Sequence, residues 1–322
     1  MACADPQIEQ MPRADLQKLQ LELLQKTVRW AAEKSEFYKE KLAGSGVPEI
    51  QSLDDVRKLP FTALTDILKR SPFDFLTLPL SGLLRVTQQQ QPMELAKMYT
   101  ANDVAANVAM LGRALVATGI NRTSVVGVLG DFSESSILDI QYALENIGAT
   151  VVPLGITIEQ AIGLMDLAGI DTLIGSSQDI MQFIIQTQIR MKDISDYPLK
   201  AVICLNESVQ NSLHRHFEDR MQVKVADLFA SAELGFCGLL YSCDEGKGYH
   251  LQEDHYLAEV IGFGNEEPIA GEGIMGELVI TTLTVEGMPL LRYRTGQAVM
   301  RINEPCPCGR TLARFATPFG GI

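Results

Sequence analysis

The sequence predicts an α/β protein that has a mainly parallel sheet flanked by helices and a smaller β-rich subdomain. The first observation is that amphipathic helical segments alternate with short β-branched apolar segments over residues 102–239, as repeated strand–helix units require. The second is that this alternation stops near residue 240, after which strand-like segments follow without a long helix. Hydrophobic residues make up 46% of the 322 residues, which is enough to bury a sizeable core.

The first part of the chain, residues 1–101, is expected to contribute one long helix and a linking segment. Apolar residues recur at roughly helical spacing along residues 13–43, and Gly44 is a suitable stop for that helix. Residues 45–75 are rich in proline and in residues that favour turns. A helix followed by a loop segment is therefore predicted for this range.

Residues 102–239 are expected to form the parallel-sheet core. A helix is predicted over residues 102–119 with Asn102 or Asp103 as its cap, and Gly148 is expected to end the next helix. The predicted strands follow in order at residues 124–130, 149–155, 171–176, 200–205 and 223–229. Residues 240–322 are expected to complete the chain as the β-rich subdomain.

The charge and hydropathy of the chain argue against some classes of partner. With 27 basic and 40 acidic side chains, the net charge is −13, whereas nucleic-acid affinity comes mostly from Lys and Arg neutralising phosphates. No apolar segment reaches the ~18–20 residues that a bilayer span needs. The N-terminal residues lack the basic and apolar regions of a signal peptide. We therefore expect a cytoplasmic protein that binds neither nucleic acid nor a membrane.

Three cysteines and one histidine in the last part of the chain form a candidate metal site. Its residues are Cys243, His250, Cys306 and Cys308. Thiolates and an imidazole suit a tetrahedral Zn²⁺, and a complete set of four protein ligands indicates a structural site. The CxC spacing is tighter than the usual CxxC, so unrelated cytosolic thiols and a surface histidine remain the alternative. Cys237 and His255 are the substitutes to consider if one ligand is misassigned.

The most specific motif in the chain is "GELVITTLTVEGMPLLRYRTGQ" at residues 276–297, followed by "CPCGRT" at residues 306–311. These segments resemble the phenylacetate–CoA ligase branch of the adenylate-forming (AMP-forming acyl-CoA synthetase) superfamily. The segments "SEFYKEKLAGSGVPEIQSLDDVRKLPFT" and "YHLQEDHYLAEVI" also match the family. The resemblance implies the large adenylation domain of such enzymes. It also strengthens the zinc prediction, because "CPCGRT" and a Cys…His pair recur in many members.

The motifs that the family uses for ATP are altered in this chain. The family's phosphate loop reads "SSGTTGxP", whereas residues 85–100 read "RVTQQQQPMELAKMYT" and contain no glycine, so close backbone approach to phosphates is lost. Where the family carries an acid for the ribose, this chain has Gln297. The resemblance implies that nucleotide binding falls to these positions: Glu207, Phe229, Ala230, Ser231, Ala232, Glu233 and Gln297. Among them, Glu233 corresponds to the acid that the family places near Mg²⁺. Ala230 and Ala232 stand where the family has a glycine and a hydroxyl residue.

These motifs leave two functional hypotheses. In the first, the chain is a degenerate family member that is not catalytic alone and has a binding or assembly role. In the second, it is a genuine ligase that activates a carboxylic acid with ATP and is completed by a separate lid subunit, because the sequence ends where the family would enter its lid domain. Structural zinc is expected in both, whereas ATP or AMP and Mg²⁺ are expected only in the second. The expected partners are a second copy or another protein subunit, and a small carboxylate or CoA.

Overall fold

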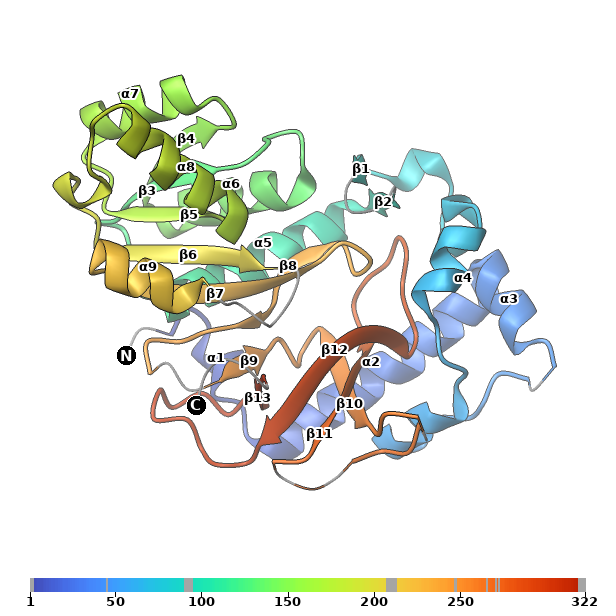
Figure 1. Ribbon diagram of the computed structural model, residues 1–322. Helices are drawn as coiled ribbons and strands as arrows, with labels where there is room; N and C mark the ends of the chain where they lie inside the picture. The colour runs from blue at the N-terminus through green and yellow to red at the C-terminus, as the bar shows by residue number, and fades with distance from the viewer. Residues whose placement is uncertain are drawn as a thin grey trace.

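The computed structural model describes residues 3–44, 46–89, 95–206, 213–245, 248–264, 266–269, 271 and 273–317. Within these residues, an 11-stranded sheet runs through most of the molecule (Figure 1). Its strands lie in this order: β10 (Tyr256–Ile261), β11 (Met275–Thr282), β12 (Tyr293–Ile302), β13 (Arg314–Ala316), β9 (Tyr249–Leu251), β8 (Phe236–Tyr241), β7 (Lys224–Ser231), β6 (Ala201–Asn206), β5 (Thr172–Ser176), β3 (Val125–Leu129) and β4 (Thr150–Gly155).

The sheet has a parallel half and an antiparallel half, as the sequence predicted. Strands β7, β6, β5, β3 and β4 are parallel neighbours, and the strands from β8 to β10 pair antiparallel. The change of direction lies between β7 and β8, where Leu228 pairs with Tyr241. The strands of residues 240–322 thus continue the sheet of the parallel core.

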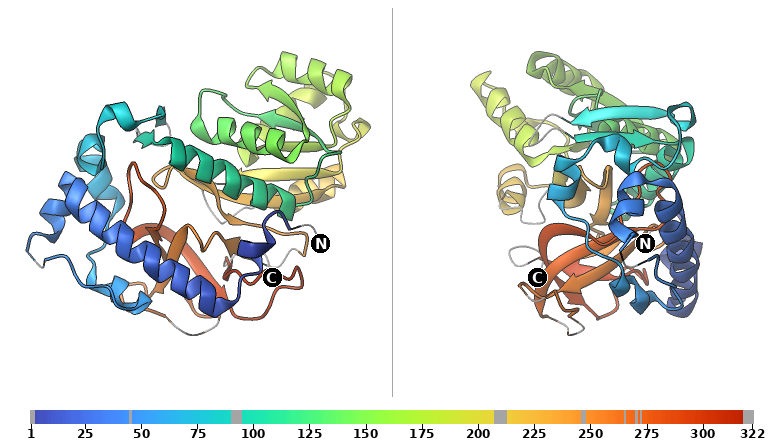
Figure 2. Two further views of the ribbon diagram at one scale, coloured as in Figure 1. Left: turned by 180° about the vertical axis from the view of Figure 1, so that it is seen from behind. Right: turned by 90° about the vertical axis from the view of Figure 1, so that its right-hand side faces the viewer.

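Helices cover both faces of the sheet in the parallel half, and a long helix lies along the antiparallel half (Figure 2). In chain order the α-helices are α1 (Pro6–Glu9), α2 (Arg13–Lys34), α3 (Glu36–Leu42), α4 (Leu64–Lys69), α5 (Ala101–Ala117), α6 (Ser135–Ile147), α7 (Ile158–Ala168), α8 (Ser177–Ile189) and α9 (His214–Met221). The short 3₁₀ helices are η1 (Leu53–Lys58), η2 (Pro72–Phe75), η3 (Leu80–Gly82) and η4 (Ile194–Asp196). Of the helices in the described ranges, none is long and apolar enough to cross a bilayer.

Two predicted helix boundaries were wrong, and each has a local cause. The single helix expected over residues 13–43 is interrupted at Ser35, which has extended backbone angles and accepts a hydrogen bond from the Tyr38 N–H. Helix α5 is capped by Thr100, whose hydroxyl accepts from the Asp103 N–H, whereas Asn102 or Asp103 had been expected as the cap. In both cases a hydroxyl side chain satisfies a backbone donor that the helix start leaves free.

Helix α2 binds the antiparallel half through polar contacts as well as apolar packing. The Gln20 side-chain amide donates to the carbonyl oxygens of Glu253 and Tyr256, and the Thr27 hydroxyl donates to the Leu283 carbonyl over 2.7 Å. Buried Leu16, Leu24 and Val28 on the same helix join the main hydrophobic core. The N-terminal part of the chain is therefore fixed to the sheet.

A two-stranded hairpin lies apart from the main sheet and leads directly into α5. Its strands are β1 (Arg85–Gln89) and β2 (Leu95–Tyr99), which pair antiparallel. Thr100 follows β2 at once and caps α5. The hairpin therefore has a fixed position relative to the helix.

The buried carboxylate of Asp103 joins α5 to the loop between β11 and β12. It accepts hydrogen bonds from the backbone N–H groups of Thr100, Glu286 and Gly287, at 2.9, 2.7 and 3.0 Å respectively. A Cβ at Gly287 would lie 2.6 Å from the Met98 carbonyl oxygen, so only glycine fits this approach. The junction links segments that are more than 180 residues apart in the sequence.

We predict that Asp103→Ala lowers the free energy of unfolding by about 2–4 kcal/mol, because three backbone donors lose a charged acceptor in a buried setting. Urea unfolding followed by circular dichroism measures the change. The control is Asp15→Ala, an exposed residue in the first turn of α2, which should change the unfolding free energy by no more than about 0.5 kcal/mol. Equal effects of the two substitutions would contradict the prediction.

Candidate functional site

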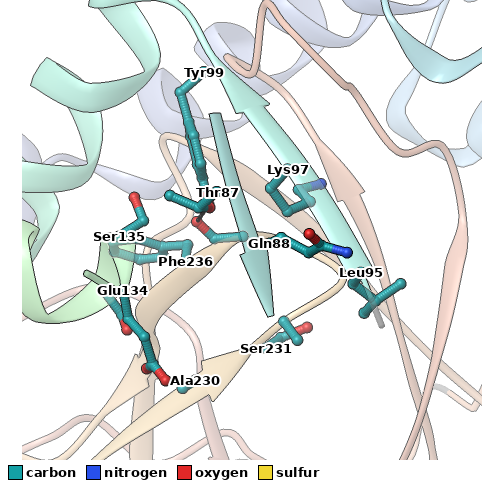
Figure 3. A pocket seen from close by; sticks show the side chains of 13 residues that line it. Thr87, Gln88, Leu95, Lys97, Tyr99, Glu134, Ser135, Ala230, Ser231 and Phe236 are labelled. Carbon is teal, nitrogen blue, oxygen red and sulfur yellow. Dashed lines mark hydrogen bonds between the residues drawn. The ribbon is translucent and has the colours of Figure 1, made fainter. Parts of the chain in front are cut away.

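Two cavities adjoin the β1–β2 hairpin and share part of their lining. The first has a volume of about 100 Å³, and the second about 230 Å³. Gln88, Leu95 and Lys97 of the hairpin line both cavities. Figure 3 shows the first cavity, where hairpin side chains face Ser231, Phe236 and the start of α6. The hairpin therefore contributes to the walls of both cavities.

The sequence-predicted nucleotide residues are distributed unevenly around these cavities. Ala230, Ser231 and Ala232 line the first cavity, and Glu233 lines the second. The other three predicted nucleotide residues are not among the described residues that line these cavities. Phe229 is buried in the core as part of β7, Gln297 lies on β12, and Glu207 lies outside the described residues.

Glu233 lies in the turn that connects β7 to β8, and neighbouring side chains hold its carboxylate. The Ser231 hydroxyl donates to the carboxylate over 2.8 Å, and the buried Tyr293 hydroxyl interacts with it as well. Burial, together with this negative charge, raises the pKa of Tyr293. The Glu233 carboxylate therefore faces the second cavity with hydrogen bonds already in place.

Lys97 is a cavity-lining charged residue that the sequence reasoning did not single out. It extends from β2 at the first cavity (Figure 3) and also lines the second. Its ammonium donates to the Glu233 backbone carbonyl over 2.8 Å. Burial lowers the pKa of Lys97 to about 8, although the charges of Asp103 and Glu233 act in the opposite direction. The available sequence signal was a lysine within the otherwise apolar strand "LAKMY".

Gly235 provides the room that Lys97 occupies. Its backbone has a φ of +68°, and a Cβ at this position would lie 2.7 Å from Lys97 Cε and 2.9 Å from the Tyr99 hydroxyl. The Tyr99 hydroxyl also donates to the Gly235 carbonyl over 3.1 Å. A glycine is therefore required here both by the backbone conformation and by the close approach of β2.

Arg85, the other cation of the hairpin, is fully engaged by partners. Its guanidinium donates to the Ser135 hydroxyl over 2.6 Å and forms an ion pair with Asp139. Asp139 also accepts from the Asn107 side chain over 3.2 Å, and burial raises the pKa of its carboxyl group. This network fixes β1 to α5 and α6, so Arg85 has a structural role beside the first cavity.

The predicted metal residues do come together in the structure. The ligand atoms of Cys243, His250, Cys306 and Cys308 all lie within 4.8 Å of one another, and all four residues are buried. Cys243 follows β8, His250 belongs to β9, and the two remaining cysteines lie between β12 and β13. These four residues could hold a metal ion that links three segments of the antiparallel half.

The geometry of this Cys₃His cluster fits a tetrahedral metal. The sulfur atoms of Cys243 and Cys306 are 3.7 Å apart, and Cys308 Sγ lies 3.3 Å from His250 Nε2. Bonds of about 2.3 Å to a tetrahedral Zn²⁺ would place two sulfur atoms about 3.8 Å apart. Hydrogen bonds from Cys243 and then from His250 lower the pKa of the Cys308 thiol, which favours the thiolate form that metals bind.

The loop that carries two of these cysteines is tied to the N-terminal helix. Arg310 forms a buried ion pair with Glu9 at the end of α1, and the Thr311 N–H donates to the Glu9 carbonyl over 2.9 Å. The alternatives considered from the sequence do not join the cluster. Cys237 is buried within β8, and His255 contacts Asp254 and Thr284.

Comparison with solved structures defines the class of fold. The chain aligns with a crystal structure of an open conformation of 2-hydroxyisobutyryl-CoA ligase in complex with 2-HIB-AMP and CoA, with a TM-score of 0.88 and 21% identity. The alignment covers 98% of this chain and 77% of that one. A structure of the same ligase in the postadenylation state with 2-HIB-AMP also gives 0.88, at 22% identity, over 98% of this chain and 70% of that one. The fold is that of the large N-terminal domain of adenylate-forming CoA ligases.

Sequence relatives then identify the family. The phenylacetate-coenzyme A ligase of Thermus thermophilus is 30% identical over 327 residues, which cover 98% of this chain and 72% of the relative. The enzyme of the same name from Aromatoleum evansii is 29% identical, over 96% of this chain and 71% of the relative. No protein-family model matches the sequence. The chain belongs to the phenylacetate–coenzyme A ligase family, which confirms the resemblance seen in its motifs.

We predict that Lys97→Met raises the free energy of unfolding at pH 7 by about 1–2 kcal/mol, because it removes a charge that burial disfavours. Because the folded-state pKa of Lys97 is depressed, the unfolded chain binds more protons between pH 8 and its ordinary value near 10.4. Wild-type stability should therefore gain from Lys97 as the pH rises through this window, and the variant should lack that gain.

Urea unfolding at pH 7 and pH 9.5 measures both effects of the Lys97 substitution. Lys200→Met is the control, since the Lys200 side chain is 78% exposed and its removal should leave the unfolding free energy nearly unchanged. A marked loss of stability in Lys97→Met at pH 7 would show that its hydrogen bond to Glu233 outweighs the burial of its charge.

Proposed function

We propose that this chain is a family member that binds a small carboxylate but does not form an acyl adenylate by itself. The observation that supports this most is the composition of the hairpin segment beside the first cavity. Residues 88–97 contain no Gly, Ser or Thr, although such residues let a loop surround a triphosphate. The cavity beside this segment and Ala230–Ala232 measures about 100 Å³, well below the 300–1,000 Å³ of sites for drug-sized ligands.

Two further differences support the loss of adenylation. Ala232 stands where the family has a hydroxyl residue, so one donor to the nucleotide is missing. Gln297 stands where the family has the ribose acid, and a neutral hydrogen bond is roughly half as strong as a charge-assisted one. Removing one such donor from a catalytic site typically lowers the rate by about 10²–10³, so the combined differences should leave little activity.

The alternative is a genuine adenylate-forming ligase that a separate lid subunit completes. Glu233 favours it, because the acid that the family places near Mg²⁺ is present and its carboxylate lies at a cavity. The hydrogen bond from Ser231 would also orient that carboxylate toward a metal. The two functions are distinguished by whether the protein releases pyrophosphate from ATP.

We predict no appreciable pyrophosphate release when this chain is incubated with ATP, Mg²⁺, CoA and a panel of aryl and fatty acids. The physical reason is that residues 88–97 contain no Gly, Ser or Thr to surround a triphosphate and that Ala232 lacks the hydroxyl that the family has at this position. A coupled pyrophosphate assay measures the rate, and Glu233→Gln is the control variant. Robust release that disappears in Glu233→Gln would establish the alternative function.

We also propose that the Cys₃His cluster holds one structural zinc ion. The donor set has no free position for a substrate, and soft thiolates with imidazole favour Zn²⁺ over Mg²⁺ or Ca²⁺. Zinc bound there would connect the end of β8, strand β9 and the loop before β13. It would thereby stabilise the antiparallel half of the sheet without taking part in ligand chemistry.

Cys308→Ser is expected to lower the zinc content from about one ion per chain to near zero. It should also destabilise the protein by several kcal/mol, because structural zinc contributes directly to folding. Elemental analysis and thermal unfolding with and without a chelator measure the two effects. Cys3→Ser, at a cysteine outside the cluster, should keep the metal. Purified wild-type protein without zinc would contradict the proposal.

A further inference from the structure

We propose that Lys97 is the anion-recognition residue of the second cavity, where its ammonium binds the carboxylate of a ligand with a compact apolar body. This inference rests on the proposed function, because it names the group that would hold the small carboxylate. It assigns ligand specificity to a residue of β2, a strand within the segment that stands in place of the family's phosphate loop.

The first argument is that the ammonium of Lys97 lacks a carboxylate partner in the described part of the chain. Its hydrogen bond goes to the Glu233 backbone carbonyl, and the Glu233 carboxylate is engaged by Ser231. A half-buried charge is costly unless it is paired. An ammonium can donate three hydrogen bonds, so Lys97 retains donors for an anion that enters the cavity.

The second argument is the contrast with the other cations near the site. Arg85 is paired with Asp139, and Arg70, at the second cavity, forms an ion pair with Glu40 and a longer one with Asp74. Their charges are thus already compensated within the protein. Lys97 is the cavity-lining cation without such an ion pair in the described residues, which makes it the group best suited to bind an incoming anion.

The third argument is the nature and size of the cavity around Lys97. Apolar residues make up most of its wall: Ile67, Leu68, Pro72, Phe75, Leu95, Ala96, Met288 and Leu290. The volume of about 230 Å³ exceeds the roughly 150 Å³ of an engineered apolar cavity that accepts benzene. One aromatic ring or a short alkyl chain with a carboxylate therefore matches both the size and the polarity of the cavity.

The charges that face Lys97 set the expected pH dependence. Asp103 of α5 and Glu233 in the turn after β7 favour its protonated form, whereas burial opposes it, and Arg70 is the further cation at this cavity. Since only the ammonium pairs with a carboxylate, the affinity should fall as the pH rises through about 8. A ligand held by apolar contacts alone would show no such change.

Calorimetric titration of the full chain with phenylacetate, phenylacetamide and benzylphosphonate tests the proposal. These probes share an aromatic ring and differ in the group presented to Lys97. Wild-type protein should bind phenylacetate most tightly, and Lys97→Met should weaken this by about 10- to 100-fold, as expected for a charge-assisted hydrogen bond. Lys97→Arg should restore part of the affinity. The exposed-site variant Lys200→Met should bind like wild type.

Each outcome supports or overturns the assignment. Equal phenylacetate affinity in wild type and Lys97→Met, or no binding to wild type, would overturn it, as would tighter binding of the phosphonate or the amide. Circular dichroism checks that the variants are folded. If Lys97→Met does not fold, the comparison of wild type with Lys97→Arg still tests the assignment. Pyrophosphate release is measured separately, so adenylation would overturn the proposed function while Lys97-dependent binding could still stand.

Discussion

The carboxylate of Asp103 is the interaction on which the arrangement of the site depends. It gathers three backbone N–H groups from the start of α5 and from the loop after β11, two segments that no local interaction would bring together. Gly287 has to be a glycine because the Met98 carbonyl lies against it. Since Met98 belongs to β2, the same junction fixes the strand that carries Lys97. The position of the cavity-lining ammonium is thus set by a contact several residues away from it.

The two cations of the hairpin show how burial decides what a charged side chain can do. Arg85 meets Asp139 and Ser135, so its charge is satisfied and contributes to the packing of α5 and α6. Within the described ranges, Lys97 donates to a backbone carbonyl and has no ion pair, so its charge remains available while its pKa is depressed. Proteins tend to keep such an unfavourable group where it serves binding, and the free energy of unfolding of the protein is lower as a result.

The Cys₃His cluster and the cavities are separate parts of the molecule with different tasks. The cluster lies where β8, β9 and the loop before β13 meet, and the Glu9–Arg310 ion pair attaches the N-terminal helix beside it. The cavities lie beside the hairpin and the turn after β7. A metal in the cluster would therefore support the antiparallel half of the sheet, whereas the proposed ligand site involves β2 and its neighbours.

The sequence alone determined the parallel core, the strand-rich last part, the family and the four cysteine and histidine residues of the cluster. These follow from periodicity and from short motifs, which depend on local spacing. The sequence analysis missed the split of the first helix at Ser35 and the cap at Thr100. Each depends on one hydroxyl side chain, and neighbouring residues in the sequence are equally suitable as helix caps. Only the tertiary structure shows the surroundings of Lys97. Its environment comes from Glu233 and Gly235, more than 130 residues away, and burial by such distant segments cannot be read from the composition of one strand.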